Sequence, residues 1–83
     1  MNIKRLETTE DFESLKKGDK ILVEWSDYWL SHATNAKKVM LYNIYQNKTS
    51  DKEIICQLKG NHYFNYEKYL NGNSVALDVY KVV

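Results

Sequence analysis

The fold of this chain is decided by the stretch Leu15–Trp25, which reads LKKGDKILVEW. Gly18 tolerates the positive φ angle of a tight turn, and Asp19 can hydrogen-bond its own neighbouring backbone. After this turn, apolar and polar residues alternate with the two-residue period of a strand. We therefore predict a strand with one strongly apolar face, formed by Ile21, Val23 and Trp25.

A short helix is predicted just before the turn, over Thr8–Leu15. A threonine hydroxyl at its start can cap the first free N–H groups, and three acidic residues near the start suit the positive end of the helix dipole. Phe12 and Leu15 are three residues apart, so both can face the sheet. Helix, glycine turn and strand together form the predicted nucleus of the fold.

Length and composition predict a single small domain over residues 1–83. A chain of this length supports one hydrophobic core, and its apolar content of 43% argues against disorder. The 12 basic and 11 acidic residues nearly balance. This balance argues against a dedicated binder of the nucleic-acid backbone, which usually carries a clear positive excess.

The single cysteine, Cys56, excludes an internal disulfide and disfavours a small secreted scaffold. No apolar run is long enough to predict a signal peptide or a membrane helix. We therefore expect a cytoplasmic protein. The abundance of lysine and asparagine, without any proline, suggests an AT-rich genome such as that of a low-GC bacterium or its phage.

The rest of the chain alternates predicted strands with turns. The stretch Ser26–Lys38 has no clean period and is expected to form a long loop or an irregular hairpin, a type of segment that is often functional. A single helical turn is predicted at Glu67–Leu70. Strands are predicted at Val39–Gln46, Glu53–Leu58, His62–Tyr66 and Ser74–Val83, and Asn2–Leu6 is either a short first strand or a loose lead-in.

The alternation within these strands also predicts which side chains face inward. Both faces of Val39–Gln46 are partly apolar, which predicts a strand that is central or that bends so that both sides become covered. In the next strand Ile54, Cys56 and Leu58 are expected to face inward. In the last strand the inward residues are expected to be Val75, Leu77 and Val79.

This order of elements resembles the small Src-homology-3-like barrels over Lys20–Val83. The resemblance implies a mostly β (α+β) fold, a five-stranded barrel with a short N-terminal helix that plugs one open end. The chain lacks the Ala-Leu-Tyr-Asp-Tyr run, the paired Trp and the Pro of the peptide-binding members of the family. No ligand or binding residue is therefore carried over, and a partly open oligonucleotide-binding-type barrel is the alternative.

Aromatic residues concentrate in two segments that such a barrel would bring near each other. Because Trp and Tyr are favoured at interface hot spots, they predict a contact surface for another protein. The alternative is that several of them fill the core of a domain that has few Leu and Phe. The residues of this predicted protein-binding surface are Tyr28, Trp29, His32, Tyr63, Tyr66 and Tyr69.

A nucleic-acid interface is the runner-up prediction. Lysines interleaved with Tyr28 and Trp29 would hold a single strand by charge and stacking. We favour the plainer interpretation, in which exposed lysines keep sheet edges from pairing with other chains. The lysines concerned are Lys16, Lys17, Lys20, Lys37 and Lys38.

No catalytic residue, metal site or cofactor is predicted. His32, His62 and Cys56 are the only soft metal ligands, and they lack the paired spacing of metal sites. Cys56 alternates with apolar residues, which is typical of a small core residue. Each of the three glycines stands alone in a turn, so no phosphate-binding loop is present.

The sequence therefore predicts a non-enzymatic binding module whose partner is another protein. The alternatives are a small barrel that binds nucleic acid and a phage or mobile-element protein that inhibits a host enzyme. The sequence does not specify the partner or the oligomeric state, although a free sheet edge would permit dimerisation.

Overall fold

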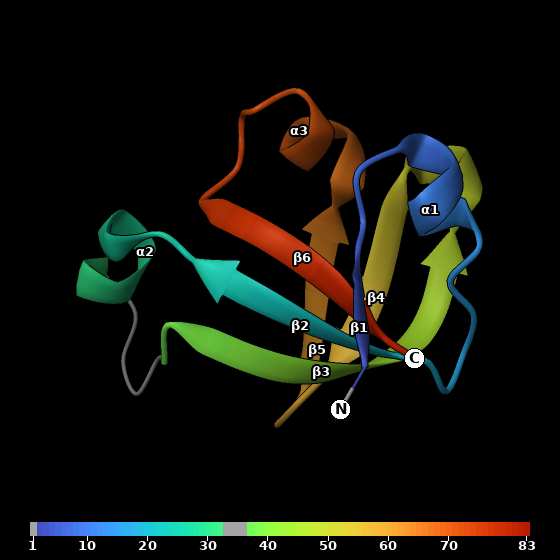
Figure 1. Ribbon diagram of the computed structural model, residues 1–83, viewed down its shortest axis with the longest axis horizontal. Coiled ribbons are helices and arrows are strands. Elements are labelled where there is room, and N and C mark those ends of the chain that lie inside the picture. Colours follow the sequence, from blue (N-terminus) through green and yellow to red (C-terminus); the bar gives the residue numbers. More distant parts are fainter. Residues whose placement is uncertain (1, 33–36) are drawn as a thin grey trace.

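The computed structural model describes residues 2–32 and 37–83, and in these residues six strands form one antiparallel sheet in the order β1-β6-β2-β3-β4-β5 (Figure 1). The strands are β1 (Ile3–Arg5), β2 (Lys20–Trp25), β3 (Val39–Lys48), β4 (Glu53–Gln57), β5 (Asn61–Asn65) and β6 (Ala76–Val82). The helices are α1 (Thr9–Glu13), α2 (Asp27–His32), the 3-10 turn η1 (Thr49–Asp51) and α3 (Tyr66–Leu70).

The mostly β class with short helices is confirmed, but the predicted closed five-stranded barrel is wrong. The N-terminal segment adds a sixth strand, because β1 pairs with β6 and places Ile3 opposite Val82. The sheet order then ends at β1 on one side and at β5 on the other. The sheet is curved but open, with these two strands at its edges.

Strand β3 carries the sheet from one layer into the next. Ile44 pairs with Cys56 and Gln46 pairs with Ile55, so Tyr45 is an extra residue, a β-bulge. Bulges bend a strand and increase its local twist. β3 accordingly turns a corner in Figure 1, and its second half with β4 and β5 forms a layer that crosses β2 and β6.

A second bulge corrects the predicted faces of the last strand. Glu24 pairs with Asp78 and Trp25 pairs with Ala76, so Leu77 is the extra residue. An extra residue reverses the alternation of side chains along the strand. Ala76 is therefore buried, whereas Leu77, which was predicted to face inward, is exposed.

The expected covering of both faces of β3 is wrong as well. The inward face buries Tyr42 and Ile44, as predicted, but Val39 and Leu41 on the other face are exposed. Leu58, which was predicted to face inward, lies beyond the end of β4 and is also exposed. The outer face of the sheet is therefore apolar at this point.

The helix predicted before the glycine turn is confirmed as α1. The Thr8 hydroxyl accepts a hydrogen bond from the Asp11 N–H at 3.2 Å, and the Asp11 carboxylate accepts one from the Thr8 N–H at 3.1 Å. This reciprocal pair is a capping box, which satisfies donors that the helix itself leaves free.

The core lies between the two layers of the sheet and is closed at one end by α1 and α3, which lie together in Figure 1. The buried Phe12 ring of α1 stacks against Tyr66 of α3, with centroids 5.1 Å apart. The buried residues of the core are Leu6, Phe12, Leu15, Ile21, Val23, Tyr42, Ile44, Ile54, Cys56, Phe64, Tyr66, Ala76 and Val79.

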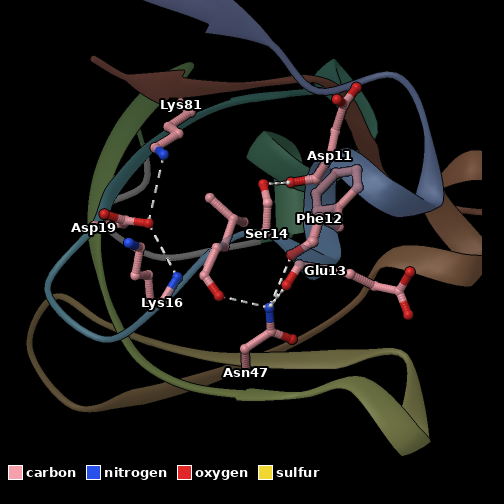
Figure 2. A network of polar contacts seen from close by, with 9 residues as sticks. Asp11, Phe12, Glu13, Ser14, Lys16, Asp19, Asn47 and Lys81 are labelled. Atoms are coloured by element: carbon pink, nitrogen blue, oxygen red, sulfur yellow. Dashed lines mark hydrogen bonds and ion pairs between the residues drawn. The ribbon is translucent and has the colours of Figure 1, made fainter.

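Asn47 joins the end of β3 to α1. Its Nδ2 donates hydrogen bonds to the carbonyl oxygens of Phe12 and Leu15, both at 2.8 Å (Figure 2). Carbonyls at the end of a helix have no partner within the helix. The Phe12 carbonyl also accepts from the Leu15 N–H at 3.1 Å, so the Asn47 amide adds a second donor there, bonds to Leu15 just after the helix, and fixes α1 to the sheet.

The glycine turn is fixed to β3 beside the Tyr45 bulge. Gly18 adopts a φ of 95° and donates its N–H to the Ile44 carbonyl at 2.9 Å, while the Ile44 N–H donates to the Asp19 carbonyl at 2.8 Å. The Asp19 carboxylate accepts from the Lys16 N–H and lies 3.7 Å from the Lys81 ammonium (Figure 2). Backbone hydrogen bonds and an ion pair thus hold the turn against β3 and β6.

We predict that Asn47→Ala lowers the free energy of unfolding by about 1–3 kcal/mol, because the Leu15 carbonyl loses the Asn47 donor and the Phe12 carbonyl keeps only its bond from the Leu15 N–H. Urea denaturation measures the change. Asn43→Ala is the matched control, since Asn43 is an exposed asparagine of the same strand. Equal losses in the two variants would contradict this role of Asn47.

Candidate binding pocket

The aromatic segment after β2 begins with a helix, α2, where a loop or irregular hairpin was predicted. The Ser26 hydroxyl accepts from the Trp29 N–H at 3.4 Å in the first turn. α2 buries none of its residues, and it lies at the end of β2 in Figure 1, away from α1 and α3. Residues 33–36 of the predicted loop lie outside the described residues.

Trp29 connects α2 to the sheet. Its ring stacks on the ring of Trp25, with centroids 4.4 Å apart and an interplanar angle of 16°. Trp25 in turn meets Tyr42 of β3 edge-on, at a centroid distance of 6.5 Å. Aromatic pairs bury a large area in a defined geometry. The stacked rings of Trp25 and Trp29 therefore hold α2 in place against the end of β2.

A pocket of about 280 Å³ lies between the Trp25–Trp29 stack and the edge strand β5. Its opposite wall includes His62 and Tyr63 of β5, and the His62 ring packs edge-on against Tyr42. None of the described residues that line the pocket is Asp, Glu, Lys or Arg. The described lining of the pocket is therefore largely aromatic and contains no acidic side chain, lysine or arginine.

One buried polar atom belongs to this pocket. The Trp25 Nε1 is buried and makes no hydrogen bond of standard geometry to a described residue. An indole N–H is a donor only, and a buried donor without an acceptor costs about 1–3 kcal/mol.

Cys56 lines the pocket from the core side. Its thiol donates to the His62 carbonyl at 3.5 Å, and burial raises the pKa of the thiol to about 11. The predicted core position of Cys56 is confirmed. Because the thiolate is the reactive form of cysteine, this protonated thiol is a weak nucleophile near neutral pH.

The predicted aromatic surface separates into an exposed part and a buried part. Trp29 and Tyr63 line the pocket. Tyr28 is exposed on α2, and its ring lies 4.5 Å from the ring of His32. Trp29 and Tyr63 thus belong to the pocket, whereas Tyr28 and His32 are exposed residues of α2 outside its lining.

Tyr66 and Tyr69 pack against the core. The Tyr66 side chain is fully buried, and the Tyr69 ring meets Phe12 edge-on at 5.7 Å. The Tyr69 hydroxyl also accepts from the Val79 N–H at 3.2 Å. For these two tyrosines the structure favours the core alternative that the sequence left open.

The lysines of the predicted nucleic-acid interface are all exposed: Lys16, Lys17, Lys20, Lys37 and Lys38. The Lys17 ammonium lies 5.1 Å from the centroid of the Tyr45 ring. Lys20 and Lys37 line a groove beside Leu41, on the outer face of β3. Trp29, in contrast, lines the pocket at the inner face beside Tyr42. The structure thus places Lys20 and Lys37 on a different surface from Trp29.

Sequence reasoning did not assign Trp25, Tyr42 or His62 to the pocket. Trp25 and Tyr42 read as inward-facing strand residues, and both do pack against the core. Trp25 and Tyr42 also line the pocket, because the sheet stays open next to β5. The sequence did contain one relevant signal, the aromatic residues that directly follow Trp25. One of them, Trp29, lines the pocket at the end of β2.

In the part of the chain that the structure describes, no group of three or more His, Cys, Asp or Glu residues could hold a metal ion. The helices described there are too short or too polar to cross a membrane.

No protein-family model, curated protein or solved structure matches the chain. Its function is therefore inferred from its own residues.

We predict that the protein loses stability as the pH rises from about 9 to about 11. The unfolded chain releases the Cys56 proton near the ordinary pKa of 9.0, whereas the folded chain releases it near 11. In this window the folded state binds more protons, so its stability falls as the pH rises. Cys56→Ala should reduce this fall when urea denaturation is repeated across the window, and an unchanged slope would contradict the assignment.

Proposed function

We propose that this protein is a binding module that recognises an extended segment of another protein. The aromatic pocket beside β5 is the observation that carries the proposal. Interface hot spots are typically aromatic residues in pockets that exclude water. An apolar side chain of the partner would enter between Trp29 and His62.

The edge strand β5 offers free backbone groups next to this pocket. The Tyr66 N–H donates to the Lys52 carbonyl at 3.0 Å, which makes that opposed pair a hydrogen-bonded one. Such pairs alternate along an antiparallel ladder, so His62 and Phe64 are the β5 residues that bond to β4. The backbone groups that point away from β4 belong to Asn61, Tyr63 and Asn65.

A partner segment would therefore bind by adding a strand to β5. In this mode backbone hydrogen bonds supply affinity, and pockets for alternate side chains supply specificity. Every second side chain of the added strand would point toward the inner face and its aromatic pocket. β5 contains no Asp, Glu, Lys or Arg, which fits an uncharged, apolar segment.

We also propose that the fold is an opened form of the Src-homology-3-like barrel. Support comes from β6, which folds back onto β2, and from the single helical turn α3, which precedes β6. The gap beside β5 is the place where the sheet would otherwise close. A partner strand at β5 would occupy that gap.

The other two functional hypotheses receive less support. Binding of single-stranded nucleic acid would require the lysines and the aromatic rings to act on one surface. Lys20 and Lys37 lie on the opposite face of β3 from the pocket. Inhibition of a host enzyme by a phage or mobile-element protein is one form that the proposed protein binding can take.

We predict that peptides selected from a random library displayed on phage bind this pocket. A selected peptide should bind Trp29→Ala at least about tenfold more weakly than the original protein, because the variant removes one wall of the pocket. Tyr80→Ala is the matched control, since Tyr80 is a tyrosine of β6 that does not line the pocket. Failure to select any peptide, or equal binding to Trp29→Ala, would reject the proposed function.

Two substitutions at one position test strand addition. Tyr63→Ala and Tyr63→Pro both remove the side chain, but only proline also removes the N–H that points away from β4. We expect Tyr63→Pro to bind the selected peptide more weakly than Tyr63→Ala, while urea denaturation shows that both variants fold. Equal affinities would show that the pocket acts without strand addition.

A further inference from the structure

We infer that the outer face of β3 carries a second binding surface, for an acidic and apolar segment of a partner protein. A groove of about 460 Å³ lies on this face, between the start of β3 and the turn after β4. It shares no lining residue with the aromatic pocket. The inference goes beyond the proposed function, because the two sites lie on opposite faces of the sheet.

The floor of this groove is apolar. Val39, Leu41 and Leu58 line it, and their side chains are 51%, 39% and 45% exposed. Val39 and Leu41 belong to β3, and Leu58 directly follows β4. Both expectations that would have covered them, the covering of both faces of β3 and the inward Leu58, are wrong. Contiguous exposed apolar residues with a polar rim are typical of interaction sites.

The rim of the groove is basic. Lys20 comes from β2, Lys37 from the segment before β3, and Lys59 from the turn between β4 and β5. None of the three forms an ion pair with a described residue. No Asp or Glu is among the described residues that line the groove. Three separate segments thus bring positive charge around one apolar floor.

The three lysines of the groove favour an acidic partner segment. Carboxylates of a bound segment would face the three lysines, while its apolar side chains would cover Val39 and Leu41. A second copy docked through the same face would oppose lysine to lysine, which is unfavourable. A nucleic acid would gain the charge but no stacking, because the described lining contains no aromatic ring.

A peptide of alternating glutamate and leucine is the probe for this groove. Its binding should be detected by fluorescence anisotropy and should shift the amide NMR signals of Leu41 and Leu58. Peptides of alternating lysine and leucine, and of alternating glutamate and serine, separate the contributions of charge and apolar contact. Both should bind at least about tenfold more weakly than the probe.

Charge reversal supplies the matched variants. The double substitution Lys20→Glu and Lys59→Glu should weaken binding of the probe at least about tenfold. The control double substitution Lys16→Glu and Lys68→Glu changes the net charge equally at exposed lysines outside the groove, and it should retain binding. Trp29→Ala should also retain binding, so this result is independent of the aromatic pocket.

Three outcomes would overturn the inference. Equal loss of binding in the two charge-reversed proteins would show that net charge alone attracts the probe. Tighter binding of oligo-thymidine than of the probe, with shifts at Leu41 and Leu58, would assign the groove to nucleic acid. Self-association in sedimentation experiments that is lost in Leu41→Ser would make this face an interface between copies of the chain.

Discussion

The bulge at Tyr45 is the constraint on which the rest of the structure depends. It lets one ten-residue strand pair with β2 in the first layer and with β4 in the second. The bend is held on both sides, because the glycine turn bonds to Ile44 and Asn47 bonds to the end of α1. Without the bend, β4 and β5 would extend the sheet sideways, and no inner face would be enclosed.

The same bend gives the two faces of β3 different properties. Tyr42 points into the core and the aromatic pocket, while its neighbour Leu41 points to the lysine-rimmed groove. The inner pocket carries no charged Asp, Glu, Lys or Arg in its described lining, whereas the outer groove carries three lysines. A partner at one of the two proposed sites would leave the other site accessible, because the sites lie on opposite faces of the sheet.

Much of the fold could be predicted because strand alternation and helix capping depend on neighbouring residues. Thr8 and the Ile21–Val23–Trp25 alternation are examples. The bulges at Tyr45 and Leu77 could not be predicted, since both residues alternate normally and the shift arises from the partner strand. The division of the tyrosines between surface and core could not be predicted either, because it depends on contacts between segments far apart in the sequence.

The open edge at β5 is the central claim, and amide hydrogen exchange of the free protein tests it most directly. If β5 is an edge strand, the amides of His62 and Phe64 should exchange slowly, because they bond to β4. The amides of Asn61, Tyr63 and Asn65 should exchange quickly, because they point away from it. Uniform protection along β5 would contradict the account, since it would mean that another strand already occupies this edge.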